Sequence, residues 1–243
     1  MKAFFDLIDE FEANHHYQHV DEMMKVALDI SDVEGSFAGE GVYGEFYTNY
    51  NQEEKQKLKQ KLGRIPDNVG IKKYTYRNLR INTAENLAVI YIAPYIRQQT
   101  SFKTPEFTGN LSLAGMIGNG FIVSQKMPGV NIFTELGRGD LGEKAAAVSR
   151  ASIEKKLSEI GVINHDMHGN NFFVKPEKIK IIKEQYEEGE PIEYDLSEGA
   201  SLFDFGFMKV KKGKLQQLKE KLITTSDSTL FKTIIGVIED MLV

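Results

Sequence analysis

The chain has 243 residues, 41% of them hydrophobic, which is enough for one core or two modest lobes. Its 30 basic and 35 acidic residues give a formal net charge of −5, which offers no general attraction to nucleic acid or anionic membranes. The absence of cysteine rules out disulfides and thiolate chemistry. Apolar runs fall short of the roughly 18 residues that a membrane span needs, and the acidic start does not resemble a secretory signal, so we expect a soluble, cytosolic protein.

The first 32 residues are expected to form a helical extension. Apolar residues recur at helical spacing between Phe4 and Leu28, with acidic residues between them, which predicts two short amphipathic helices. Three histidines lie between the two sets: His15, His16 and His19. Solvated positions at helix ends are favoured over a metal site for them, because no carboxylate or cysteine completes a ligand set.

A glycine-rich segment follows, and its pattern predicts a strand, a glycine turn and a second strand. Gly39, Gly41 and Gly44 satisfy G-x-G-x-x-G, with Tyr43 near the tip of the turn. A dinucleotide-binding version needs a helix that begins within the motif, whereas this chain continues as the alternating stretch EFYTNY. A loop whose backbone N–H groups cover nucleotide phosphates therefore fits better, with an ordinary glycine-rich hairpin as the alternative.

The rest of the first half predicts one helix and three more strands after a charged excursion. Residues 51–68 are charged and helix-prone and are expected on the surface. Residues 68–77 predict a strand, and residues 83–99 predict a helix that is opened by Thr83 and Glu85. Strands are also expected at 111–117 and 120–127, around the turn Gly118-Asn119-Gly120. The order is therefore β-β-β-α-β-β.

A lysine on the third strand is the next candidate for chemistry. In the run V-G-I-K, the small Gly70 shares a strand face with Lys72, whereas Lys73 points to the other face unless the register slips by one residue. A lysine in such a position needs a carboxylate to hold it. Glu85 is the expected partner and Glu106 the fallback, with helix capping as the alternative role of Glu85.

The character of the chain changes after a linker at Met127–Val130, where we place a boundary between two lobes. Residues 142–160 predict a strong helix with a broad apolar side. A polar loop then leads to a charged segment at 177–199, for which we expect a protruding hairpin that is either a solvated excursion or a partner-binding element. A strand at 201–210 and a C-terminal helical stretch complete the pattern.

The polar loop after the long helix carries the sequence D-x-x-x-x-N. Asp166 precedes Asn171 at this spacing, directly before an apolar strand. An aspartate that orients an attacking hydroxyl and an asparagine that ligates Mg²⁺ have to converge on one γ-phosphate, which explains the pair. His168 lies between them and is expected to help hold that phosphate. His165 and His168 also have an i, i+3 spacing that suits a metal, but Mg²⁺ prefers oxygen ligands and zinc is disfavoured.

The tripeptide Asp204-Phe205-Gly206 ends a short apolar run. Its aspartate is expected to bridge Mg²⁺ to the phosphates together with Asn171. A tripeptide alone is weak evidence for this role. The order of all the motifs along the chain is stronger evidence: glycine loop, lysine strand, helix, two strands, linker, long helix, D-x-x-x-x-N and D-F-G.

In this order the chain resembles the protein-kinase superfamily over roughly residues 33–210. The resemblance implies an α+β, bilobal fold with an antiparallel five-stranded N-lobe at 33–127 and a reduced helical C-lobe at 128–243. It implies ATP and Mg²⁺ as cofactors, with Lys72 on the α- and β-phosphates and Asp166 as the catalytic aspartate. The linker then corresponds to the hinge, with Gln125 and Met127 meeting adenine through their backbones and Ser124 as gatekeeper.

Two departures narrow the resemblance. Asn164-His165 stands where the superfamily usually has His-Arg, and only 37 residues follow the D-F-G, with no A-P-E. This reduction resembles the minimal effector kinases of the OspG, NleH and HopBF type that bacterial pathogens and symbionts inject. The expected function is then a monomeric Ser/Thr protein kinase that is secreted into the host cytosol, acts on a host protein and uses a host protein as activator.

Two other functions remain open. The D-x-H-x-x-N pattern at His168 is also usual in small-molecule kinases of the aminoglycoside type, whose acceptor pocket lies in an extensive helical C-lobe. A kinase scaffold can instead serve as a binding module without catalysis. The presence of all four phosphate- and metal-handling residue types disfavours this last function.

Overall fold

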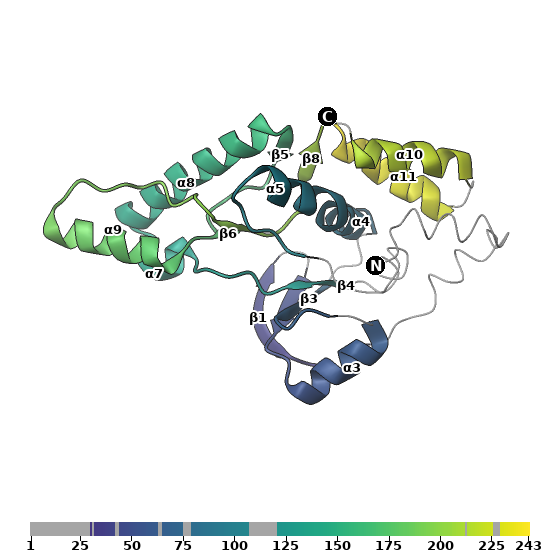
Figure 1. Cartoon of the computed structure of the whole chain (residues 1–243), viewed down its shortest axis with the longest axis horizontal. Coiled ribbons are helices and arrows are strands. Elements are labelled where there is room, and N and C mark those ends of the chain that lie inside the picture. Colours follow the sequence, from purple (N-terminus) through teal and green to yellow (C-terminus); the bar gives the residue numbers. More distant parts are fainter. Residues whose placement is uncertain are drawn as a thin grey trace. The chain divides into compact units, whose positions relative to one another are not determined.

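The computed structural model describes residues 30, 32–41, 44–62, 65–74, 79–106, 121–211, 213–225 and 229–243, which make a mixed α/β protein (Figure 1). These residues belong to two compact units. The first unit draws on Met1–Tyr91, Glu106–Lys126 and Lys212–Val243, and the second on Ile92–Pro105 and Met127–Lys211. The predicted N-terminal helices, their three histidines, Tyr43 and the predicted strand at 111–117 lie outside the described residues.

A four-stranded antiparallel sheet forms the centre of the first unit. Its strands are β1 (Ser36–Gly41), β2 (Gly44–Thr48), β3 (Val69–Tyr74) and β4 (Phe121–Gln125), in the order β1-β2-β3-β4. Strands β1 and β2 pair as far as Gly41 opposite Gly44, and the two residues between these glycines lie outside the described residues. Four of the five expected strands are therefore described, and they are antiparallel throughout.

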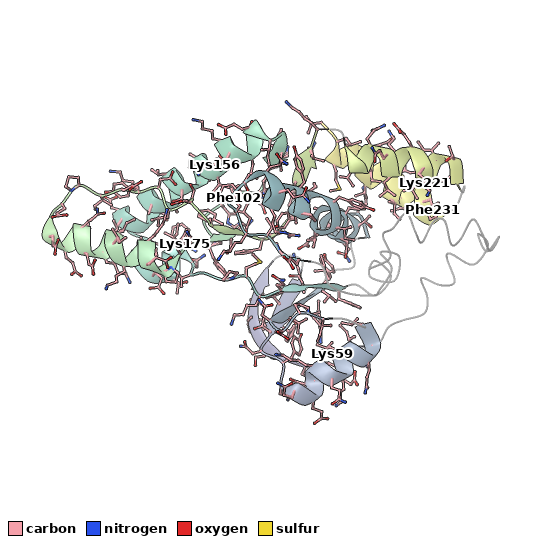
Figure 2. All side chains as sticks on the ribbon, viewed as in Figure 1. Lys59, Phe102, Lys156, Lys175, Lys221 and Phe231 are labelled. Atoms are coloured by element: carbon pink, nitrogen blue, oxygen red, sulfur yellow. The ribbon has the colours of Figure 1, made fainter. Side chains whose placement is uncertain are left out.

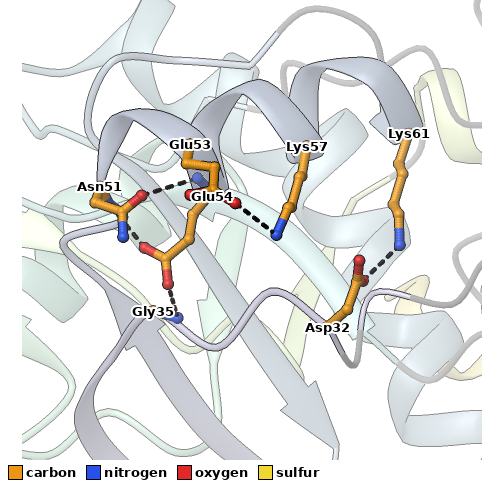
Figure 3. A network of polar contacts seen from close by, with 7 residues as sticks. All are labelled: Asp32, Gly35, Asn51, Glu53, Glu54, Lys57 and Lys61. Atoms are coloured by element: carbon orange, nitrogen blue, oxygen red, sulfur yellow. Dashed lines mark hydrogen bonds and ion pairs between the residues drawn. The ribbon is translucent and has the colours of Figure 1, made fainter.

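Helix α3 (Gln52–Leu62) begins with a reciprocal cap, drawn in Figure 3. The Glu54 main-chain N–H donates to Asn51 Oδ1 at 2.9 Å, and the Asn51 N–H donates to Glu54 Oε2 at 2.7 Å. The other oxygen of Glu54 accepts from the Gly35 N–H at 3.3 Å, which ties the helix to the chain before β1. Lys57 and Glu53 add an i, i+4 ion pair at 3.0 Å. Asn51 and Glu54 thus fix where the helix starts.

The same helix lies on the surface between β2 and β3, as expected, and two leucines attach it to the core. Leu58 and Leu62 are buried in a cluster that includes Val69, Ile71 and Val123 from the sheet. The helix is polar everywhere else, so its apolar stripe is only one residue wide per turn. Burying two leucines contributes about 1.5–3 kcal/mol each, which is enough to fasten a charged helix to a sheet.

The helix predicted at 83–99 is present but begins earlier and is interrupted. Helix α4 (Leu79–Leu87) is followed by a π-helical turn, η2 (Ala88–Ile92), and by α5 (Ala93–Gln99). Thr83 and Glu85 lie inside α4, so a helix-capping role for Glu85 is wrong. The wide turn directly precedes Pro94, which has no N–H and whose ring excludes a regular helical turn before it.

The C-terminal helices belong to the first unit, although the sequence placed them in the second lobe. Helix α10 (Lys214–Thr225) packs on α11 (Thr229–Met241), and α11 packs on α4. Phe231, labelled in Figure 2, is buried, as are Ile234 and Ile238. An ion pair joins Lys219 to Glu239 at 2.8 Å, linking α10 to α11. The apolar face of α11 therefore covers the helix that carries Glu85.

The second unit is built around a long helix. Helix α7 (Ile132–Leu136) is capped by Asn131, and α8 (Asp140–Glu159) follows it where the sequence predicted a helix. Ile153 and Leu157 of α8 are buried. The Lys156 ammonium lies 5.7 Å from the ring centroid of Phe102 (Figure 2), a cation–π contact. Among the described helices, none has the length and hydropathy to cross a bilayer.

Two small ladders follow α8, and they correct the prediction of a single strand at 201–210. Strand β5 (Val162–Asn164) pairs with β8 (Met208–Val210), and β6 (Phe172–Phe173) pairs with β7 (Ser201–Leu202). Asp204 lies between β7 and β8 with a φ of +63°, a left-handed conformation outside the strand region.

The charged segment at 177–199 is not a hairpin. It contains helix α9 (Pro176–Glu188), which ends at Gly189 with φ +71°. Proline at the first helical turn and glycine at the end are ordinary start and stop signals, and Ile179 and Ile182 are buried at helical spacing. Helix α9 packs on α7 within the second unit, and its two buried isoleucines belong to the core, whereas residues 186–191 are exposed.

Candidate functional site

In the first unit, Lys72 and Glu85 form an ion pair. The Lys72 ammonium donates to both oxygens of Glu85, at 2.9 and 2.8 Å, and their side chains are 16% and 7% exposed. The Tyr74 hydroxyl donates to Glu85 Oε2 at 2.9 Å. Charges this buried are tolerated only when they are paired and hydrogen-bonded, so the carboxylate holds the ammonium in one place.

The alternatives to this pair make other contacts. Lys73 points away from Lys72, its ammonium 3.4 Å from the Val33 carbonyl oxygen and 4.9 Å from the Tyr47 ring centroid. Glu106 accepts from the Gln125 amide at 3.3 Å. Of the residues weighed from the sequence, the structure therefore brings together Lys72 and Glu85. Their role toward a nucleotide stays a prediction.

The glycines of the G-x-G-x-x-G motif differ in what they accommodate. A Cβ at Gly44 would lie 2.6 Å from the Lys73 carbonyl oxygen, so the β2–β3 pairing itself requires glycine there. A Cβ at Gly39 or Gly41 would meet nothing within 4 Å among the described residues. These two glycines are therefore not explained by packing in the described part of the chain. Open space beside them suits the close approach of a ligand to the backbone.

An aromatic ring fills the space beside Gly70. A Cβ at Gly70 would lie 2.3 Å from the Phe46 ring, so the glycine leaves room for that ring and not for an unoccupied cavity. Across the sheet, Gly70 is opposite Ser124, the expected gatekeeper, which is buried and donates to the Gln125 carbonyl oxygen at 3.2 Å. The small residue has a packing reason that the sequence pattern alone did not show.

The predicted hinge residues fall where the two units divide along the chain. Gln125 is the last residue of β4, opposite Val69, and Met127 is the first residue of its segment of the second unit. The Lys126 N–H donates to the Asn68 carbonyl oxygen at 2.9 Å, which extends the sheet pairing by one residue. Met127 is buried. Contact of Gln125 and Met127 with adenine stays a prediction.

In the second unit, two asparagine side chains hold the main chain of Asp166. The Asp166 N–H donates to Asn164 Oδ1 at 2.9 Å. The Asn171 amide donates to the Asp166 carbonyl oxygen at 2.8 Å and lies 3.4 Å from its carboxylate oxygen Oδ2. The first and last residues of the D-x-x-x-x-N loop, Asp166 and Asn171, are therefore in contact.

Asn171 and Asp204 lie at the same end of the β6–β7 ladder. In that ladder Phe172 is opposite Leu202, and the Phe203 N–H donates to the Asn171 carbonyl oxygen at 3.3 Å. Asp204 is the next residue, held in the left-handed conformation described above. Such a conformation is costly for a residue other than glycine and persists where the surroundings impose it, often at functional sites. Three oxygen-bearing side chains of the second unit are thus gathered on adjacent segments.

These residues suit Mg²⁺. The Asn171 amide nitrogen is engaged with Asp166, which leaves the amide oxygen as the metal-binding atom. That oxygen and the Asp204 carboxylate are hard ligands of the kind that Mg²⁺ prefers. In the part of the chain that the structure describes, no three or more His, Cys, Asp or Glu side chains form a metal-binding group, and His165 and His168 are both exposed. The donor set therefore favours Mg²⁺ over zinc.

His168 has a defined hydrogen-bonding role within this loop. Its Nδ1 accepts from the Asn170 N–H at 3.2 Å. With Nδ1 as the acceptor, the ring proton of a neutral histidine is on Nε2, and the His168 side chain is exposed. An exposed N–H donor next to Asp166 suits a phosphate oxygen, as the sequence predicted for His168, although no contact in the structure tests this.

Sequence reasoning missed two residues that support the predicted ones. Tyr74 shares a strand face with Lys72, so the period-two pattern of β3 contained a signal for it. Asn164 was treated only as a departure from the usual His-Arg pair. Nothing in its sequence context indicated that its side chain would bond to the Asp166 main chain.

No family model matches this chain, and no curated protein is similar to it in sequence. Among solved structures it is similar to WbdD, determined with the kinase inhibitor LY294002, at 11% identity and a TM-score of 0.37, over 84% of this chain and 45% of that one. It is also similar to Rv3197 from Mycobacterium tuberculosis, determined with erythromycin, at 13% identity and a TM-score of 0.37, over 94% of this chain and 64% of that one. The chain thus spans less than two thirds of either protein. Likenesses at this level establish neither a family nor a function.

Proposed function

We propose that this chain is an ATP- and Mg²⁺-dependent phosphotransferase with a kinase-like, two-lobed fold. The observation that carries the proposal is the gathering of Asp166, Asn171 and Asp204 on adjacent segments of the second unit, two of them at one end of the β6–β7 ladder. Phosphoryl transfer to a hydroxyl requires a carboxylate that acts on the hydroxyl, here Asp166, beside two oxygen ligands for the metal ion, here Asn171 and Asp204.

Each of the three residues has a distinct role in the proposed reaction. Asp166 orients the acceptor hydroxyl and takes its proton as the new oxygen–phosphorus bond forms and the bond between the γ-phosphorus and the β–γ bridging oxygen breaks. Asn171 and Asp204 hold Mg²⁺, which when bound neutralises charge on the phosphates. His168 donates its Nε2–H to a γ-phosphate oxygen. ADP and a phosphorylated acceptor leave.

The residues of the first unit are proposed to bind the nucleotide. The Lys72 ammonium, fixed by Glu85 and indirectly by Tyr74, neutralises α- and β-phosphate charge. The backbone at Gly39 and Gly41 approaches the phosphates closely, because open space replaces side chains there. Gly44 and Tyr43 complete this loop, and the backbones of Gln125 and Met127 are proposed to bind adenine.

For the acceptor we propose a serine or threonine of a protein. The described helices of the second unit are α5, α7, α8 and α9, whereas α10 and α11 belong to the first unit. This leaves little helical structure to enclose a small acceptor next to Asp166. That the protein is a bacterial effector acting on a host protein, with a host activator, rests only on the resemblance to minimal effector kinases and extends the proposal.

Two observations favour other functions. The exposed Nε2–H of His168 in D-x-H-x-x-N suits a small-molecule kinase. The Phe46 ring fills the space beside Gly70, on the strand face that carries Lys72, and less room for a nucleotide there would favour a binding module with weak or no catalysis. Both alternatives make different predictions for the products of the reaction.

The first experiment compares the wild-type chain with Asp166→Ala in ADP release from Mg-ATP, with host-cell protein added as acceptor and activator, and in ATP binding by calorimetry. We expect ADP release to fall by a factor of about 10³ while ATP affinity changes by less than about threefold, because Asp166 acts on the acceptor and not on ATP. Asn170→Ala is the matched control in the same exposed loop. Unchanged ADP release in Asp166→Ala would contradict the proposal, and ATP binding without turnover in the wild type would favour the binding module.

A second experiment separates the acceptors. The wild-type chain and Asp166→Ala are incubated with γ-labelled ATP and either host-cell protein or a panel of aminoglycosides and small metabolites. Label in protein bands that depends on Asp166 supports the protein kinase. Label only in a small molecule would replace it with the small-molecule kinase.

A further inference from the structure

Asn164 is the last residue of β5 and lies two residues before Asp166. It is 8% exposed, and its Oδ1 accepts from the Asp166 N–H at 2.9 Å. Only the oxygen of a carboxamide can accept, so this bond fixes which way the amide is turned. Its Nδ2 is consequently buried, and among the described residues it has no acceptor.

An unsatisfied buried donor is a cost to stability, so packing alone does not explain an asparagine here. The strand does not need the side chain either. Asn164 is paired with Met208 through the β5–β8 ladder, and the His165 N–H donates to the Phe207 carbonyl oxygen at 3.3 Å. Backbone bonds therefore already hold the end of β5, and the Asn164 side chain adds a constraint on Asp166 specifically.

This constraint has a counterpart on the other side of Asp166. The Asn171 amide binds the Asp166 carbonyl oxygen at 2.8 Å, so one carboxamide holds the N–H of Asp166 and another holds its C=O. A residue held at both ends of its own backbone has little freedom in φ and ψ. Its carboxylate is then directed by the backbone and a single χ1 choice.

We propose that Asn164 is a positioning residue, whose side-chain oxygen holds the Asp166 main chain so that the carboxylate meets the acceptor hydroxyl. The inference rests on the proposed function, since it assigns Asn164 a part in the same reaction. Asn164 does not touch the nucleotide or the acceptor. Its loss misplaces Asp166, and a misplacement of about 1 Å lowers the rate by about 100-fold.

The test measures kcat and KM for ATP from ADP release by the full chain, with host-cell protein present at a fixed concentration as acceptor and activator. For Asn164→Ala we expect kcat to fall about 10- to 100-fold with KM for ATP within about twofold of wild type. Asn164→Ser keeps an oxygen that can accept from the N–H two residues on, so its kcat should stay within about threefold of wild type. If Asn164 had only a structural role, the kcat values of Asn164→Ala and Asn164→Ser would not differ in this way.

Asp195→Ala provides the matched control in the same unit. Asp195 Oδ1 accepts from the Ser197 N–H at 2.9 Å, which is the same bond between a side chain and the N–H two residues later. Its removal should leave kcat within about twofold of wild type, because Ser197 has no part in the reaction. If Asn164→Ala does not fold, Asn164→Thr and Asn164→Val replace it, since they are nearly equal in shape and only threonine offers an acceptor.

The possible outcomes separate the two claims. The positioning role is supported if kcat falls in Asn164→Ala or Asn164→Val and is restored in Asn164→Ser or Asn164→Thr. Two results with an active wild type overturn that role and leave the proposed phosphotransferase activity unaffected. One is an unchanged kcat in Asn164→Ala, and the other is an equal fall of kcat in Asn164→Ser and in Asp195→Ala. A wild type that releases no ADP overturns both.

Discussion

At the scale of single residues, the buried ion pair of the first unit is the contact most sensitive to change. Lys72 donates to both oxygens of Glu85, and Glu85 also accepts from the Tyr74 hydroxyl. Removing one member of a buried pair leaves the other charge without compensation, and this costs more than the pair itself contributes.

Glu85→Ala should therefore lower both stability and nucleotide binding. We expect the free energy of unfolding to fall by about 3 kcal/mol, because the Lys72 ammonium remains partly buried without its carboxylate. ATP affinity should fall as well, since the ammonium is no longer held in place. Urea denaturation and calorimetry measure the two effects. Glu106→Ala is the control, and an equal loss in that variant would contradict the assignment of Glu85 as the partner.

The glycine motif gives a second residue-scale prediction, because its members differ in their surroundings. Gly44→Ala places a Cβ 2.6 Å from the Lys73 carbonyl oxygen and should lower the free energy of unfolding by about 1–3 kcal/mol. Gly41→Ala meets nothing in the described structure and should change stability by less than about 0.5 kcal/mol. It should nevertheless weaken ATP binding. Equal ATP affinity in wild type and Gly41→Ala would argue against a phosphate contact at that position.

At the scale of elements, the packing of α11 on α4 links the C-terminal helices to Glu85. Ile234 of α11 is fully buried, whereas Ile223 of α10 is 58% exposed. The two isoleucines allow the same substitution to be compared in a core position and on the surface.

Ile234→Ala should lower the free energy of unfolding by about 2–4 kcal/mol and Ile223→Ala by less than about 0.5 kcal/mol. Because α11 covers α4, the first variant should also speed amide hydrogen exchange in residues 79–87, as measured by mass spectrometry. Exchange in α4 that is the same in both variants would show that α11 does not stabilise the helix bearing Glu85.

The elements also show what the sequence could and could not predict. Strands β1 to β4 and helix α8 follow from alternation and helical periodicity, because each has a strong local pattern. Helix α9 was missed because its charged residues outnumber its two buried isoleucines, although Pro176 and Gly189 marked its ends. The break between β7 and β8 includes Asp204 in a left-handed conformation, which no local propensity for strand can indicate.

At the scale of the whole molecule, the two units are not two successive halves of the chain. Residues 92–105 belong with the second unit, and the C-terminal helices belong with the first. Periodicity gives the type of an element and not the unit in which its apolar face is buried. The site residues were predicted from their expected chemistry and not from periodicity. Lys72 was paired with Glu85 and Asp166 with Asn171, and both pairs are in contact in the structure.

The central claim is that the chain carries out a Mg-ATP-dependent phosphoryl transfer in which Lys72 and Asp204 take part. The most direct measurement is the initial rate of ADP release in the presence of host-cell protein as acceptor and activator, once with Mg²⁺ and once with EDTA. Wild type, Lys72→Ala, Asp204→Asn and the exposed control Lys126→Ala are compared, and the folding of each is checked by its melting temperature. We predict that wild type and Lys126→Ala release ADP only with Mg²⁺, and that Lys72→Ala and Asp204→Asn lose at least about 100-fold in rate. Folded Lys72→Ala or Asp204→Asn protein that keeps the wild-type rate, or a wild type with no ADP release at all, would contradict the account.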